Sequence, residues 1–190
     1  VIFIPTILGY GSPLQAIQLL WLNLVTDGAP ALALGTEKGD PDIMEQKPRP
    51  YNEPIINQQM RIGVLIQAIF ITAATLGAYF IGLAHNQVYA QTMAFITLSV
   101  SELLRAYTAR SEFFPLLKIG IFGNKWMNYA VGASLALILL VLYVPFLNVV
   151  FKTVPLGLPE WIRILPLILV PSVAAEVTKV FLRRSMQAKA

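Results

Sequence analysis

The sequence predicts an all-α membrane protein, built as a bundle of five full transmembrane helices plus the end of a sixth, with one broken helix. Of its 190 residues, 56% are hydrophobic and 13% are charged, whereas a soluble domain carries about 25% charged residues. The mean hydropathy is +0.66. The apolar residues also gather into long segments, and a helix of about 20 apolar residues spans the bilayer. These observations exclude a soluble globular fold.

The elements follow from these segments in chain order. Residues 1–8 are apolar but too short to cross a hydrocarbon core of about 30 Å, so we expect the end of a transmembrane helix whose first part precedes the chain. Five longer segments each predict a full transmembrane helix, over 14–34, 61–83, 88–107, 127–150 and 161–182. Prolines inside the first and last are compatible with this, because neighbouring helices can satisfy the freed backbone groups.

The basic residues predict the orientation. Twelve of the fourteen lie in or beside three segments that emerge on one side: the loop 35–59, the loop 108–126 and the C-terminal tail. Only Lys152 and Arg163 lie on the other side. Since basic residues accumulate on the cytoplasmic side of membrane proteins, both loops and the C-terminus are expected to be cytoplasmic. Topology thus explains the net charge of +4, and no nucleic-acid partner is expected.

The loop 35–59 is the longest polar stretch. It contains Pro41, Pro48, Pro50 and Pro54 among mixed charges, a composition typical of extended, irregular backbone. Two interpretations remain open: a solvated connector, or a docking segment for a cytoplasmic domain.

Composition excludes several kinds of site. There is no cysteine, so neither a disulfide framework nor a thiolate metal site can form. The single histidine, His85, argues against a histidine-built zinc or iron centre. The sequence also lacks a glycine-rich phosphate loop, a Ser-His-Asp set and a helical His-Glu-x-x-His motif.

Polar residues interrupt the segment 14–34 in a pattern that indicates cation binding. Asn23, Thr26 and Asp27 stand at positions i, i+3 and i+4, which share one face of an α-helix. They offer an amide, a hydroxyl and a carboxylate oxygen, which hard cations such as calcium bind. Gly28 and Pro30 are expected to loosen the helix and free carbonyls, as in the broken helices of transporters. The alternative is a polar patch that only joins helices by hydrogen bonds.

A carboxylate at this depth needs a partner, because an unpaired one costs at least about 2.5 kcal/mol on insertion scales. For Asp27 that partner is expected to be a bound cation or a proton. Glu102 is the second carboxylate inside a predicted span, and it is either a ligand or the partner of Arg105 at i+3. Arg105 either points inward, where it would neutralise a carboxylate and displace an ion, or extends to the membrane surface. Glu176 and Lys179 repeat the spacing, and a structural ion pair is expected there.

The segment Gln18–Gly35, which contains Asn-Leu-Val-Thr-Asp-Gly-Ala-Pro, strongly resembles the sixth transmembrane helix of calcium-transporting P-type ATPases of the sarco/endoplasmic-reticulum type. The resemblance continues through Asp42-Ile43-Met44, Lys47-Pro48-Arg49 and Glu53-Pro54-Ile55-Ile56, and stays in register to the end of the chain. Sodium/potassium pumps and plant-type proton pumps carry different strings there. The resemblance implies the C-terminal half of a pump's membrane domain, from the end of the fifth helix to the tenth.

For individual residues, the resemblance implies that Asn23, Thr26 and Asp27 bind the transported calcium, with Asp27 serving two adjacent sites. Glu102 stands where such pumps place a carboxylate ligand of the eighth helix, which favours a second site. Arg105 departs from the small polar residue expected one turn later, and this places the second site in question. The implied partners are calcium ions, the lipid bilayer, and the remaining transmembrane helices and cytoplasmic domains of the parent pump.

The expected function is ATP-driven calcium transport out of the cytoplasm. Magnesium and ATP are expected to act in the parent's phosphorylation and nucleotide domains, so the fragment alone is expected to be inactive. By the same resemblance, the loop 35–59 would contact the phosphorylation domain.

An ion-coupled secondary carrier and a non-transporting membrane scaffold remain as alternatives. The absence of cysteine and the short loops favour a bacterial plasma membrane. The sequence leaves open whether the transported ion is calcium or manganese, and whether one or two ions move in each cycle.

Overall fold

The computed structural model describes residues 1–40, 43–44, 54, 56, 58–111 and 114–187. Within these residues every regular element is helical and no strand occurs. The elements in chain order are α1 Phe3–Ile7, α2 Ala16–Leu22, the π-helical segment η1 Asn23–Asp27, α3 Gly28–Leu34, α4 Gln58–Leu83, α5 Gln87–Thr108, α6 Leu116–Ile119, the 3₁₀ turn η2 Ile121–Gly123, α7 Lys125–Tyr143, α8 Pro145–Phe151 and α9 Leu158–Gln187.

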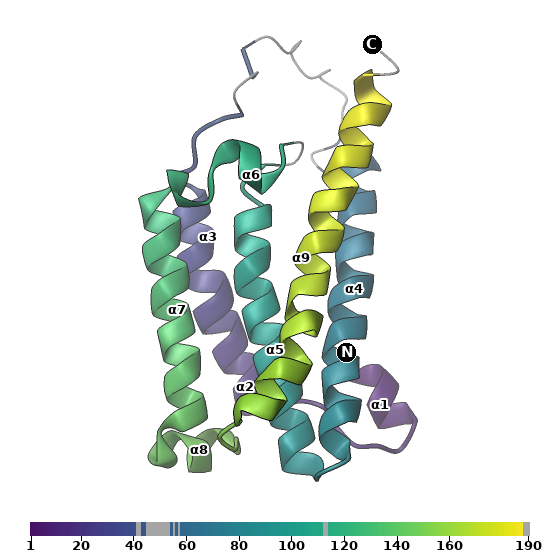
Figure 1. Cartoon of the computed structure of the whole chain (residues 1–190), viewed down its shortest axis with the longest axis vertical. Helices are drawn as coiled ribbons and strands as arrows, with labels where there is room; N and C mark the ends of the chain where they lie inside the picture. The colour runs from purple at the N-terminus through teal and green to yellow at the C-terminus, as the bar shows by residue number, and fades with distance from the viewer. Residues whose placement is uncertain (41–42, 45–53, 55, 57, 112–113, 188–190) are drawn as a thin grey trace.

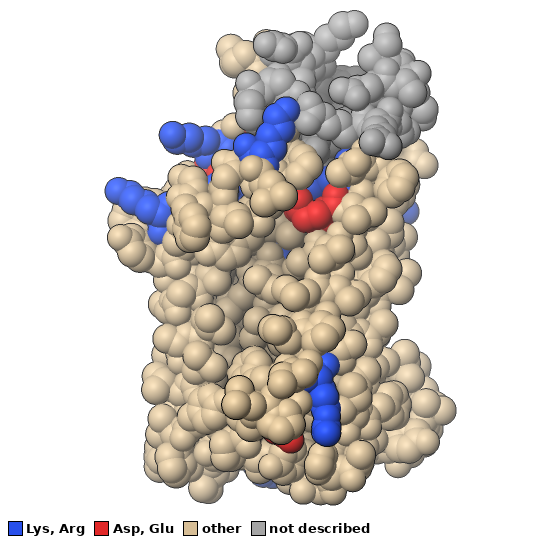
Figure 2. All heavy atoms as spheres, viewed as in Figure 1, with Lys and Arg blue, Asp and Glu red and all other residues tan. Residues whose placement is uncertain are grey.

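The long helices run side by side along the long axis of the molecule, with α2, η1 and α3 forming one continuous column (Figure 1). In the part of the chain that the structure describes, four helical segments are long and apolar enough to cross a membrane: Ala16–Leu34, Met60–Leu83, Lys125–Tyr143 and Leu158–Phe181. On the face drawn in Figure 2, charged side chains gather toward the two ends and the band between them is uncharged. This is the pattern of an integral membrane protein.

Helix α5 is as long as the others but less apolar, and it lies inside the bundle. It packs against α4, α9, α7 and α3. Two of its buried hydroxyls donate to backbone carbonyls: Ser99 Oγ to Phe95 at 2.7 Å, and Ser101 Oγ to Ile168 of α9 at 3.3 Å. The hydroxyl of Thr97, also buried, has no hydrogen-bond partner among the described residues. Because α5 is surrounded by protein, these serines have hydrogen-bond partners that lipid would not offer.

One predicted boundary was wrong. The helix expected over 127–150 ends at Tyr143, and α8 starts at Pro145. The residue before a proline avoids the helical conformation, and Val144 is extended, with φ −83° and ψ 117°. The Asn148 side chain then donates to the carbonyls of Val141 and Leu142 at 2.8 and 2.9 Å. The exposed carbonyls of α7 are therefore capped by residues that hydropathy had assigned to the same helix.

The other predicted segments lie close to the observed helices. The segments 61–83 and 88–107 fall within α4 and α5, and 161–182 falls within α9, which extends further at both ends. Residues 1–8 form only the short, largely exposed helix α1, and its origin in a longer transmembrane helix stays a prediction. Most of the loop 35–59 lies outside the described residues.

The connections place three segments at the same end of the bundle. The C-terminal ends of α3, α5 and α9 point to the end that also holds α6, whereas α8 lies at the opposite end (Figure 1). The start of the loop 35–59, the α5–α7 connection and the C-terminal end of α9 therefore share one side, as the distribution of basic residues predicted.

Candidate cation site

The predicted broken helix is interrupted by a wider turn and is not unwound. The π-helical segment η1 covers Asn23–Asp27 and leads directly into α3 at Gly28. Pro30, which follows, has no N–H, so one carbonyl of the preceding turn loses its helical donor. The Ser134 hydroxyl of α7 donates to the Val25 carbonyl at 2.7 Å. A side chain from a neighbouring helix thus satisfies a backbone oxygen beside the candidate ligands. Single π turns occur often at functional sites.

The π segment separates the three residues that α-helical spacing had placed on one face. Thr26 is buried, with 5% of its surface exposed, and its hydroxyl donates to the Leu22 carbonyl at 2.8 Å. Asn23 and Asp27 are exposed in the chain as described. A π turn contains more residues than an α turn, so position i+3 (Thr26) turns away from position i (Asn23), whereas i+4 (Asp27) stays on a similar side.

A cavity of about 340 Å³ lies between this column and α5, and we call it the α3–α5 cavity. Its lining residues are Thr26, Asp27, Pro30, Ala31, Leu34, Glu102, Arg105, Ala106 and Ala109. Two carboxylates that are far apart in sequence, Asp27 and Glu102, therefore border the same space. Three of the four predicted ligands line the cavity, and Asn23 does not.

Glu102 already has a partner in the structure. The Arg105 Nε donates to Glu102 Oε2 at 2.7 Å, and the two side chains are 44% and 20% exposed, respectively. The salt bridge that spacing offered as the alternative to ion binding is thus present, inside the cavity itself. Among the described residues no group of three or more His, Cys, Asp and Glu side chains is placed to hold a metal ion. Calcium takes six to eight oxygen ligands, so the described residues supply only part of a calcium site.

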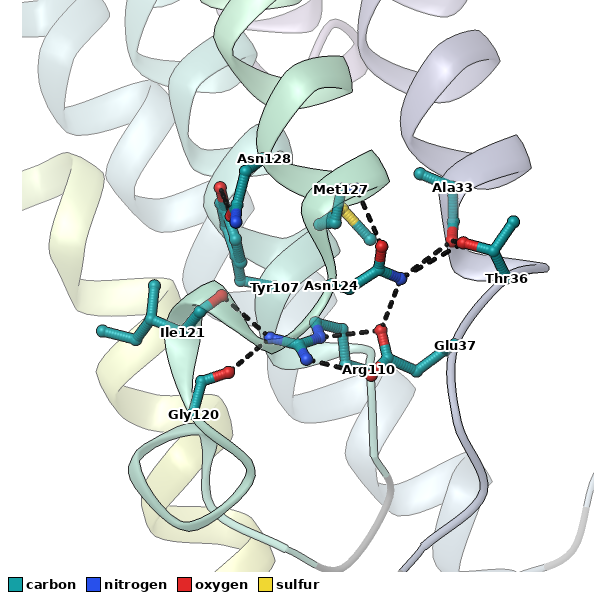
Figure 3. Close-up of polar contacts among 10 residues, drawn as sticks. All are labelled: Ala33, Thr36, Glu37, Tyr107, Arg110, Gly120, Ile121, Asn124, Met127 and Asn128. Carbon is teal, nitrogen blue, oxygen red and sulfur yellow. Dashed lines mark hydrogen bonds and ion pairs between the residues drawn. The ribbon is translucent and has the colours of Figure 1, made fainter.

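Close to the cavity lies a buried polar group that sequence reasoning missed, which we call the Arg110 cluster: Arg110, Glu37 and Asn124 (Figure 3). Arg110 follows α5, Glu37 follows α3, and Asn124 precedes α7. Arg110 donates from Nε to Glu37 Oε2 at 2.8 Å and from Nη2 to Oε1 at 2.9 Å, a bidentate pair. Its Nη1 donates to the carbonyls of Gly120 and Ile121 at 2.8 and 3.0 Å.

Asn124 completes the Arg110 cluster. Its amide donates to Glu37 Oε2 at 2.8 Å and to the Ala33 carbonyl at 3.2 Å, while its Oδ1 accepts from the Met127 amide at 3.1 Å. The hydrogen bonds from Arg110, and with smaller weight the one from Asn124, lower the pKa of Glu37 against the opposing effect of burial. In the sequence, Arg110 counted only as a topogenic charge and Glu37 as part of a solvated loop. Only the capping role of Asn124, an asparagine just before an apolar helix, is a local signal.

The ion pair expected between Glu176 and Lys179 is present at the same end of the bundle. Lys179 Nζ lies 2.8 Å from Glu176 Oε1. The other carboxylate oxygen accepts from the Leu116 amide at 2.8 Å, and Nζ donates to the Phe114 carbonyl at 3.4 Å. This pair holds the α5–α7 connection against α9, and among the described residues none of its hydrogen bonds reaches α3.

The helical membrane fold agrees with a comparison to known proteins. Residues 11–181 match the family described as cation transporting ATPase, C-terminus. The chain belongs to this family. Among individual relatives of this cation-transporting ATPase region, calcium-transporting ATPase 1 of Schizosaccharomyces pombe is 37% identical over 161 residues, covering 84% of this chain and 18% of that protein.

Two further relatives come from a bacterium and a mammal. Calcium-transporting ATPase 1 of Bacillus cereus is 32% identical over 195 residues, covering 94% of this chain and 22% of its own length. Calcium-transporting ATPase type 2C member 1 of Pongo abelii is 32% identical over 180 residues, covering 94% of this chain and 20% of its own length. The chain thus spans about a fifth of the length of these cation-transporting ATPases.

Proposed function

We propose that this chain forms the C-terminal part of the ion-binding membrane domain of an ATP-driven calcium pump, which moves calcium out of the cytoplasm. One observation carries the proposal: Asp27 and Glu102, from separate helices, line one cavity in a chain of the cation-transporting ATPase family. The names of the relatives supply the choice of calcium. Neither a secondary carrier nor a scaffold is favoured by any contact described above.

Asp27 is the principal ligand that we assign to this chain. Its carboxylate borders the α3–α5 cavity and forms no salt bridge among the described residues. Thr26 can add its hydroxyl oxygen, because a hydroxyl that donates to Leu22 keeps lone pairs for a cation. Glu102 is available only when Arg105 is displaced. Asn23 is the first residue of the same π segment and does not line the cavity, and its amide oxygen would bind an ion held between this column and the rest of the pump.

The remaining assignments concern the parent protein. We propose that α5 is a fifth membrane crossing, since it runs through the middle of the four apolar ones. The end of the bundle with the α5–α7 connection and the C-terminus is proposed to face the cytoplasm of a bacterial cell, where the loop 35–59 would meet the phosphorylation domain. Magnesium and ATP would act in the other four-fifths of the parent.

The test is Asp27→Asn in the full-length parent, reconstituted into vesicles, with calcium uptake and calcium-activated ATP hydrolysis as readouts. The amide keeps the size of the side chain and removes its charge. We expect half-saturating calcium to rise by at least about tenfold, equivalent to about 1.4 kcal/mol. Asp40→Asn is the matched control, because Asp40 lies beyond α3 and outside the cavity. Calcium activation unchanged in Asp27→Asn would refute the site, and activation by manganese alone would refute the ion.

A further inference from the structure

The Arg110 cluster joins the column formed by α2, η1 and α3 to helix α5, and these are the two elements that carry the candidate ligands. Glu37 lies ten residues after Asp27, and Arg110 lies eight residues after Glu102. With a rise of about 1.5 Å per helical residue, these separations correspond to about 15 and 12 Å along the bundle. The cluster therefore fixes the two columns to each other at nearly the same height, a short distance from the α3–α5 cavity.

The column that carries Asp27 is also the one that needs an external attachment. Helix α3 is only seven residues long, and it is joined to α2 through the π segment. Gly28 and Pro30 beside that junction weaken the backbone hydrogen bonding that would make the column stiff. The position of Asp27 relative to α5 consequently depends on what holds the far end of α3, in addition to the Ser134 hydrogen bond to Val25. In the structure, Glu37 and the Ala33 carbonyl are held there by Arg110 and Asn124.

The α5–α7 connection is shaped around the guanidinium of Arg110. Gly120 has φ +85°, a conformation that favours glycine, and its carbonyl accepts from Arg110. A Cβ atom added at Gly123 would lie 3.1 Å from Arg110 Nη2. The Arg110 side chain is 1% exposed and that of Glu37 12%. A buried ion pair adds little net stability compared with apolar packing, so stability alone does not account for this arrangement.

We propose that the Arg110 cluster is a positioning device: it sets the placement of the Asp27 column against the Glu102 helix and thereby the affinity of the pump for its cation. Arg110, Glu37 and Asn124 touch no ion themselves. The inference rests on the proposed function, since it assigns the residues that hold the two sides of that ion site in register.

Two single variants and one double variant of the full-length pump test it: Glu37→Gln, Arg110→Met and their combination. Each single variant leaves one buried group without its partner and lowers stability, whereas the double variant removes both charges and restores much of that stability. A positioning role predicts that half-saturating calcium rises about two- to thirtyfold in all three, the range for residues remote from a ligand. The maximal rate per folded pump should change less than the calcium affinity.

Glu176→Gln is the matched control. Glu176 belongs to an ion pair on the same α5–α7 connection, and in the part of the chain that the structure describes its hydrogen bonds do not reach α3, so half-saturating calcium should stay at the wild-type value. If the double variant recovers wild-type calcium affinity together with stability, the cluster is only structural and the inference is overturned. An equal affinity loss in Glu176→Gln overturns it as well, because any disturbance of the connection would then suffice.

The outcome for Asp27→Asn separates the two proposals. If the wild-type pump responds to calcium and Asp27→Asn loses that response while the Arg110 cluster variants keep it, only the positioning inference fails. A wild-type parent that calcium does not activate overturns the proposed function and the inference together.

Discussion

Arg105→Met tests whether Arg105 competes with calcium for the carboxylate of Glu102. In the structure the Arg105 Nε lies 2.7 Å from Glu102 Oε2, and both residues line the α3–α5 cavity. Two unit charges at this distance attract each other by about 1.5 kcal/mol in water. Because 44% of the Arg105 side chain is exposed, solvent screening and the ordering of the two side chains keep the net stabilisation at or below this value.

A calcium ion that binds Glu102 must first displace Arg105. Removal of the guanidinium ends this competition, so half-saturating calcium is expected to fall by up to about tenfold, equivalent to about 1.4 kcal/mol. Methionine retains an apolar stem of similar length, so the packing of the Arg105 side chain against the cavity wall is largely kept.

The assay is calcium-activated ATP hydrolysis by four forms of the full-length pump: the wild type, Arg105→Met, Glu102→Gln and the double variant. In this double-mutant cycle, Glu102→Gln should have little effect beside Arg105 and should abolish the gain in Arg105→Met. If Arg105→Met binds calcium more weakly than the wild type at an equal folded fraction, Arg105 supports the ion site and the reasoning above is wrong.

Two further predictions concern stability. The Arg110 guanidinium holds the pKa of Glu37 below its ordinary value of 4.5, so the contribution of Glu37 is complete above that pH and is lost as the pH falls through the lower folded-state pKa. Thermal stability of the full-length pump should thus drop more steeply on acidification in the wild type than in Glu37→Gln, and parallel curves would contradict this. Ser134→Ala leaves the Val25 carbonyl without its donor and should cost about 1–3 kcal/mol. A thermal midpoint equal to that of the wild type would show that water or another donor replaces the hydroxyl.

Local sequence patterns were sufficient to predict the helices whose length and composition are set by the thickness of the bilayer. An apolar segment of spanning length predicted α4 closely, because a membrane helix is recognised by length and hydropathy alone. The oxygen-bearing residues Thr26 and Asp27 were found for a similar reason: polar groups are rare inside such segments. Hydropathy failed at Pro145, where α8 is as apolar as α7 but packs as a separate helix.

The sequence by itself determined the helical membrane fold, the placement of its basic segments at one end and the candidate ligands on the interrupted helix, since each depends on neighbouring residues. Only the tertiary structure placed Glu102 in the same cavity as Asp27 and paired it with Arg105 there. It alone brought Arg110 to Glu37, 73 residues apart in the chain. Contacts between helices depend on which faces meet and at what height, and no local period carries that information.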